Sequence, residues 1–313
     1  MEHPVGKMKC FHPQTIKDNV VSCGRCPACK KNRINGWVCR LERHSRNQDS
    51  AHFITLTYAE GQAKRTEPKG KHKGLLTLDY THVQHFLKTL RNLQNAEKKW
   101  KRRYNRHATK KGKRIRQPLR TTEKPISYYV AGEYGSKNKQ TPRPHYHIIL
   151  FNATTELIPR AWATGNQFGR ISRGNVHQGN ITGGSIRYTL KYISKPSRLP
   201  LFEGDNRTPE FSYMSKGIGK NYLTPKIIAW HKADILNRYY VPNAGGVQTT
   251  MPRYYANKIY TPAERIQIAE HLEKQSSYNF YQEVLQNPDI VRDFLLAQKK
   301  MERDALHKNQ SLI

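Results

Sequence analysis

Two histidines stand one residue apart in the stretch PHYHIILF, at the start of an apolar run. Side chains of an extended chain alternate between faces, so His145 and His147 point one way and Tyr146 the other. Two imidazoles on one face offer neutral nitrogen donors, which a divalent ion binds together with a hard oxygen ligand. Glu133, in GEYG on the preceding predicted strand, supplies that oxygen if a hairpin pairs the two strands. The pattern predicts a metal site, although an H-x-H pair alone also fits two half-buried imidazoles.

A nucleophile is the chemistry suggested by YTLKYISK. Tyr188 and Tyr192 fall one helical turn apart on the same face, with Lys195 on that side and Lys191 adjacent. A phenol with a reference pKa of about 10 attacks poorly at neutral pH unless nearby cations or a base favour the phenolate. The lysines meet that need. The alternative is a pair of rings lining a core stripe in a tyrosine-rich chain.

The cysteines are all near the N-terminus: Cys10, Cys23, Cys26, Cys29 and Cys39. A disulfide-stapled domain would spread its cysteines through the chain, whereas gaps of two residues favour a metal. Cys23, Cys26 and Cys29 form overlapping C-x-x-C pairs, and Cys10 or His12 completes a tetrahedral set. A structural Zn²⁺ is the preferred interpretation, with an iron–sulfur cluster and unbound thiols as alternatives. Cys39 is expected to pack in the following helix.

The chain carries 55 Lys and Arg against 23 Asp and Glu, a formal net charge of +32. This surplus predicts a polyanionic partner, and nucleic acid is favoured over a membrane because no Lys-rich amphipathic anchor accompanies it. Residues 98–120 contain many basic residues and no acid, so they form either a solvated surface or a phosphate-contacting arm. The candidate DNA contacts are Lys98, Lys99, Lys101, Arg102, Arg103, Lys110, Lys111, Lys113 and Arg114.

No run of 18 apolar residues occurs, and MEHPVGKMKC lacks the apolar centre of a signal peptide. The expected location is therefore the cytoplasm in which the protein is made, with no membrane partner.

The elements that position these residues follow from the hydrophobic pattern. Strands are predicted in AHFITLTYA, at 126–135 and at 145–151, and helices in RINGWVCRLERHS and at 183–196. An apolar stripe predicts a helix in TLDYTHVQHFLKTLRNLQ, with Asp79 or Thr81 as its cap. Residues 1–32 read as irregular. The sequence TPAE from Thr261 is a capping box that opens C-terminal helices.

The predicted fold is α+β: a mostly antiparallel central sheet that carries the histidines, flanked by helices, one of which carries the tyrosines. An N-terminal Cys-rich module and a helical C-terminal region complete it. The expected domains are 1–45, 46–235 and 236–313.

In this order, FITLTY, PHYHIILF and YTLKYISK resemble the three motifs of HUH endonucleases, the rolling-circle replication initiators. Two tyrosines separated by three residues resemble the two-tyrosine superfamily. CGRCPACKKNRINGW together with GEYG and RPHYHIILF further resembles the replication initiators of microviruses, specifically the gokushovirus branch. The likeness runs from about residue 10 to about residue 225.

The resemblance implies that His145 and His147 hold Mg²⁺ or Mn²⁺, with Glu133 as the expected third ligand. Because histidines suit transition ions, Mn²⁺ is expected to support the faster reaction. One tyrosine would nick single-stranded origin DNA, leaving a 5′-phosphotyrosine and a free 3′-OH. The other would act later, when the circle is rejoined. Lys191 or Lys195 would stabilise the phenolate or the phosphate.

The same resemblance implies that the strand with Thr55 and Thr57 is central and adjoins the metal strand, a structural role. It also implies host replication machinery, including a helicase, as partner, and the host bacterial cytoplasm as location.

Two other classes of protein share some of these features. A non-enzymatic, basic, zinc-containing nucleic-acid-binding protein fits the composition equally well, but binding alone does not require H-x-H together with Y-x-x-x-Y. A transposase or mobilisation relaxase would normally carry a different tyrosine arrangement.

Overall fold

The computed structural model describes residues 10, 12, 14–16, 19–68, 74–107, 119–135, 143–166, 169–181, 183–194, 199, 202–286, 299 and 303. The chain divides into two compact units, residues 45–218 and residues 1–44 with 219–313. Each unit is described by itself. The domain limits expected from the sequence, at 45/46 and 235/236, stay a prediction.

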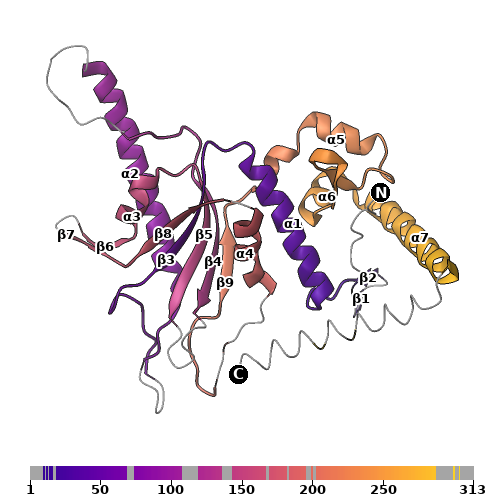
Figure 1. Ribbon diagram of the computed structural model, residues 1–313, viewed down its shortest axis with the longest axis horizontal. Coiled ribbons are helices and arrows are strands. Elements are labelled where there is room, and N and C mark those ends of the chain that lie inside the picture. The colour runs from indigo at the N-terminus through magenta and orange to yellow at the C-terminus, as the bar shows by residue number, and fades with distance from the viewer. Residues whose placement is uncertain are drawn as a thin grey trace. The chain divides into compact units, whose positions relative to one another are not determined.

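A five-stranded sheet forms the middle of the unit 45–218 (Figure 1). Its strand order is β8-β3-β5-β4-β9, and every neighbouring pair is antiparallel. The strands are β3 (Ala51–Thr57), β4 (Ser127–Tyr134), β5 (Pro144–Phe151), β8 (Val176–Asn180) and β9 (Phe211–Met214). The predicted α+β class with a mostly antiparallel central sheet is confirmed.

One face of this sheet packs against α2 (Tyr80–His107). The predicted apolar stripe of α2 is almost fully buried, at Val83, Phe86, Leu87 and Leu90. The helix begins where Asp79 accepts a hydrogen bond from the Thr81 N–H at 2.8 Å, so Asp79, of the two predicted caps, is the cap. The 3₁₀ turn η1 (Thr155–Leu157) and α3 (Ile158–Ala161) extend this core.

Tyr146 fixes the orientation of β5. Its side chain lies on the α2 side, fully buried, and burial raises its pKa to about 12. The Asp79 N–H donates to the Tyr146 hydroxyl at 2.9 Å, and that hydroxyl donates to the Asp79 carbonyl at 3.0 Å. Because side chains alternate along a strand, His145 and His147 are directed to the opposite face, as predicted. Helix α4 (Gly183–Ser194) contacts β4, β5 and β9.

The remaining elements of this unit are the strands β6 (Ala163–Asn166) and β7 (Gly169–Ser172), which pair with each other. The sequence analysis predicted no element between residues 152 and 182. Strands β6, β7 and β8 are rich in Gly, Asn and Ser and show no apolar alternation, so the periodicity that reveals buried strands is absent from them.

The second unit contains α1 (Pro27–Ser45) and the C-terminal elements. These are η2 (Lys220–Tyr222), α5 (Pro225–Lys232), β10 (Tyr240–Pro242), η3 (Ala244–Gly246), β11 (Gln248–Thr250), α6 (Arg253–Ile259) and α7 (Pro262–Gln286). Its core includes Cys39, Tyr222, Tyr255 and Tyr260. Cys39 therefore packs in a core, as predicted.

The capping box is present at the start of α7. The Thr261 N–H donates to Glu264 Oε2 at 2.7 Å, and the Glu264 N–H donates to Thr261 Oγ1 at 3.3 Å.

The prediction that residues 1–32 are irregular is wrong in part. Strands β1 (Gln14–Ile16) and β2 (Asn19–Val21) form a hairpin, and α1 begins at Pro27, several residues before the predicted helix. Pro27 occupies the first helical position, where a missing N–H is harmless. The apolar stripe that was used to place the helix starts later because this first turn contains Cys29 and lysines instead of large apolar residues.

Candidate active site

Glu133, His145 and His147 converge on one point of the sheet. In the β4–β5 ladder Glu133 lies directly opposite His145, and Ala131 lies opposite His147. Glu133 Oε1 is 2.7 Å from His145 Nε2 and 3.0 Å from His147 Nε2. The two imidazole rings meet edge to face, with centroids 5.0 Å apart. The structure thus brings the three predicted ligands together, because antiparallel register places opposite side chains on one face.

The two imidazoles are held by their other nitrogens. His147 Nδ1 lies 3.0 Å from the Thr55 hydroxyl on β3, and His145 Nδ1 lies 3.3 Å from the Arg143 carbonyl. A carbonyl oxygen only accepts, so His145 carries a proton on Nδ1 in this contact. A hydrogen bond at Nδ1 fixes the tautomer in which Nε2 offers its lone pair. Both Nε2 atoms face Glu133.

This donor set fits a divalent cation. The three ligand atoms lie within 4.8 Å of one another, and they are two imidazole nitrogens and one carboxylate oxygen. Glu133 and His147 are each 5% exposed, while the His145 side chain is 18% exposed. A carboxylate oxygen shared between two imidazoles needs protons between the atoms, and a cation bound there would take the place of those protons. Histidine nitrogens suit transition ions such as Mn²⁺, and a carboxylate suits Mg²⁺ or Mn²⁺.

Tyr188 stands beside this cluster. Its ring centroid is 5.2 Å from that of His147 and 6.1 Å from that of Phe53, and it meets both rings nearly at right angles. The helix that carries it turns Ile186, Thr189 and Leu190 into the protein, and Tyr188 remains 41% exposed. A phenol that is accessible from solvent and adjacent to the predicted ligands is suitably placed to meet a polymeric substrate.

The other residues predicted on α4 are less well defined. Lys191 and Tyr192 belong to the backbone of α4, but their side chains lie outside the described part of the structure. Lys195 lies outside the described residues altogether. Their proposed roles rest on the sequence.

Two neighbours of His147 were not predicted as site residues. Phe53 stacks on the His147 ring, with centroids 5.7 Å apart and planes 10° from parallel. Thr55 lies opposite His147 in the β3–β5 ladder. The sequence placed both in a strand beside the metal strand, and β3 does pair with β5. Only the register of that pairing, however, shows which residues meet His147.

The predicted DNA-contacting residues extend along the second half of α2. Lys99, Lys101, Arg102 and Arg103 are exposed. Lys98 is partly buried and pairs with Glu123 at 3.7 Å. The other candidates, Lys110, Lys111, Lys113 and Arg114, lie outside the described residues.

The four predicted zinc ligands also form a group. The sulfurs of Cys10, Cys23, Cys26 and Cys29 all lie within 4.8 Å of one another, and no disulfide joins them. His12, the alternative fourth ligand, is not part of that group.

Within the described parts of the chain, no helix has both the length and the apolar character needed to cross a membrane.

Comparison with known proteins gives a consistent result. Residues 51–197 match the model of the replication-associated protein ORF2 family. The chain is 25% identical to replication-associated protein VP4 of Bdellovibrio phage phiMH2K over 242 residues, which cover 74% of this chain and 65% of that relative. It is 23% identical to replication-associated protein ORF2 of Spiroplasma virus 4 over 304 residues, 91% of this chain and 83% of the relative.

No solved structure shows a significant match to the chain. The matched family region spans β3, β5 and the backbone of α4, so it contains the His145–His147 pair and Tyr188. The resemblance to phage replication initiators is confirmed: in residues 51–197 this chain carries the defining region of the replication-associated protein ORF2 family.

Proposed function

We propose that this protein initiates rolling-circle DNA replication by nicking single-stranded origin DNA through tyrosine attack, and that it later rejoins the circle. The observation that carries the proposal is the position of Tyr188, whose ring lies against His147 of the Glu133–His145–His147 cluster. Binding alone would not need a nucleophile beside a set of metal ligands. The relationship to viral replication-associated proteins supports the same function.

Glu133, His145 and His147 would hold Mg²⁺ or Mn²⁺. When bound, the cation would polarise the scissile phosphate and offset the charge that accumulates during displacement. Thr55 and the Arg143 carbonyl orient the two imidazoles, so the ligand atoms are arranged before the cation arrives. The ligands come from paired strands of a sheet, which hold their positions more firmly than loops would.

Tyr188 is the proposed nucleophile. Its phenolate oxygen attacks phosphorus, a Tyr–O–P bond forms, and the bond from phosphorus to the 3′ oxygen breaks. The proton lost by the phenol is balanced by the proton gained by the released 3′ oxygen. No water is consumed, so one phosphodiester is exchanged for another and the step can be reversed to join ends. The free 3′-OH primes synthesis.

Tyr192, one helical turn further along α4, is the proposed second nucleophile, which would act when the origin is regenerated. Lys191 or Lys195 would favour the phenolate or contact the phosphate. Exposed basic residues on α2 would hold the DNA backbone, and aromatic side chains can stack on unpaired bases. Host replication proteins, a helicase among them, are the proposed partners, and the host bacterial cytoplasm is the proposed location.

A covalent-capture assay tests the proposal. The purified protein is incubated with the circular single-stranded genome and Mn²⁺ or Mg²⁺, digested with nuclease, and analysed by peptide mass spectrometry. We expect a nucleotide adduct on the peptide that bears Tyr188 and Tyr192. The adduct should decrease in Tyr188→Phe or Tyr192→Phe and disappear in the double variant.

Tyr254→Phe is a matched control, because Tyr254 is a partly exposed tyrosine in the other unit. The adduct should be unchanged in that variant. Tight binding of the genome without an adduct under either metal would overturn the proposal, and would leave a non-enzymatic, basic nucleic-acid-binding protein as the function.

A further inference from the structure

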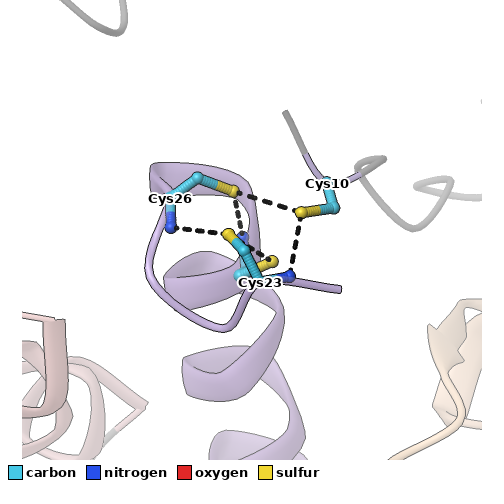
Figure 2. Close-up of side chains that lie close together, drawn as sticks. Cys10, Cys23 and Cys26 are labelled. Carbon is cyan, nitrogen blue, oxygen red and sulfur yellow. Dashed lines mark hydrogen bonds between the residues drawn. The ribbon is translucent and has the colours of Figure 1, made fainter. Parts of the chain in front are cut away.

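Four cysteine sulfurs gather at the N-terminal end of α1, outside the site described above. Figure 2 shows Cys10, Cys23 and Cys26 turned toward one another. The Cys10 and Cys26 sulfurs are 3.9 Å apart, and the Cys23 and Cys29 sulfurs are 4.0 Å apart. These separations are far longer than the roughly 2.05 Å of a disulfide. A tetrahedral ion with metal–sulfur bonds of about 2.3 Å places its sulfurs about 3.8 Å apart.

Backbone N–H groups point at three of these sulfurs. The N–H groups of Arg25 and Cys26 each lie 3.4 Å from Cys23 Sγ, and the Cys29 N–H lies 3.5 Å from Cys26 Sγ. The Cys23 N–H lies 3.2 Å from Cys10 Sγ. A neutral thiol is a weak acceptor, whereas a thiolate accepts strong, charge-assisted hydrogen bonds. The backbone is therefore arranged for thiolates.

The helix favours negative charge at the same place. Helix α1 begins at Pro27, directly after Cys26, and has no acidic residue in its first turn. The N-terminus of a helix carries a partial positive charge that anions stabilise. In α1 the sulfurs of Cys26 and Cys29 are in position to supply that charge.

This part of the chain also lacks an ordinary core. The local cluster consists of Cys26, Ala28 and Cys29, with Cys10 and Cys23 packed against it. The β1–β2 hairpin, which lies between Cys10 and Cys23 in the sequence, is two strands of three residues each, a size that is marginally stable on its own. Segments this small are usually held by a disulfide or a metal, and these cysteines form no disulfide.

We infer that Cys10, Cys23, Cys26 and Cys29 bind a single structural Zn²⁺ that ties the N-terminal segment to the first turn of α1. Binding converts four thiols to thiolates and releases their four protons. An iron–sulfur cluster fits less well, because its ligands bind different iron atoms and are held apart by the cluster itself. A single ferrous ion would share the geometry, but zinc binds such a site more tightly.

Metal analysis of the purified full-length protein tests the inference. We expect about one zinc per chain in the wild type and in Cys39→Ala, and none in Cys26→Ala. Cys39 is the matched control, because it is a buried cysteine of the same unit that lies in a different core. After removal of the metal with a chelator, Co²⁺ should restore thiolate charge-transfer absorption and the visible bands of a tetrahedral ion.

A second readout does not depend on a variant that folds. Amide hydrogen exchange of wild-type protein should show protected N–H groups at Cys23, Arg25, Cys26 and Cys29 with zinc, and loss of that protection with chelator. Equal zinc content in Cys26→Ala and wild type, no zinc in the wild type, or iron with acid-labile sulfide would each overturn the inference. None of these readouts involves DNA cleavage, so the zinc site and the proposed nickase can fail separately. His145→Ala should keep its zinc.

Discussion

At the scale of single residues, His145 and His147 are the side chains on which the proposed cleavage depends. Replacement of either with Ala should abolish metal-dependent cleavage and leave salt-sensitive DNA binding nearly unchanged, since phosphate contacts come from Lys and Arg elsewhere. Cleavage and fluorescence anisotropy with the same single-stranded DNA measure the two properties.

His177→Ala is a strict control for this pair. His177 is exposed on β8 and lies opposite Thr55, as His147 does on the other side of β3, so it shares their face of the sheet. It should keep both cleavage and binding. If the His145 and His147 variants lost binding to the same degree as cleavage, the histidines would be structural.

Thr55 has a separate, testable role as a positioning residue. Thr55→Val removes the group that holds His147 Nδ1, and loss of such a partner typically lowers metal affinity by about 10–100-fold. We expect the Mn²⁺ concentration for half-maximal cleavage to rise by that order, with cleavage recovering at saturating Mn²⁺. Thr55→Ser keeps the hydroxyl and should behave as the wild type.

Thr57→Val is the control on the same strand and face, because its hydroxyl makes only a long contact, 3.4 Å, to the Asn175 carbonyl. It should leave the Mn²⁺ dependence unchanged. A Thr55→Val variant whose loss of cleavage did not respond to Mn²⁺ would show that Thr55 only supports the strand.

At the scale of elements, Tyr146 connects β5 to the start of α2. Tyr146→Phe removes a buried hydroxyl that bonds both the N–H and the carbonyl of Asp79, and leaves the buried groups of Asp79 short of a partner. The expected loss in the free energy of unfolding is about 1–3 kcal/mol, measured by denaturant titration.

Tyr213→Phe should give the opposite result. The Tyr213 hydroxyl is buried with no hydrogen-bond partner among the described residues, so its removal relieves a desolvation penalty. That variant should be neutral or slightly stabilising. Equal destabilisation by both substitutions would mean that the Tyr146 hydrogen bonds are not what stabilises this junction.

At the scale of the whole molecule, the net charge of +32 governs DNA affinity. The triple variant Lys99→Ala, Lys101→Ala and Arg102→Ala removes exposed charges from α2. If each contacts one phosphate of single-stranded DNA, the slope of log affinity against log salt should become shallower by about 2. Anisotropy titrations over a range of salt concentrations measure this slope.

A charge-matched control uses exposed residues of the other unit: Lys226→Ala, Arg253→Ala and Lys258→Ala. It changes net charge equally and should shift the slope less. Equal effects would indicate that charge anywhere on the protein suffices and that α2 is no specific arm.

The sequence by itself determined the features that depend on local spacing. Strand alternation put His145 and His147 on one face, the apolar stripe of α2 revealed its buried side, and TPAE marked the start of α7. These patterns can be read because each is imposed by backbone geometry over a few neighbouring residues. The C-x-x-C spacing likewise identified Cys23, Cys26 and Cys29 without any structure.

Only the tertiary structure decided the contacts that span long stretches of the chain. The register of β4 against β5 places Glu133 beside both histidines, and the register of β3 against β5 places Thr55 on His147, 92 positions away. A shift of one residue in either ladder would turn those side chains to the opposite face. Such register is set by which side chains the whole sheet buries against α2, and no local pattern contains that information.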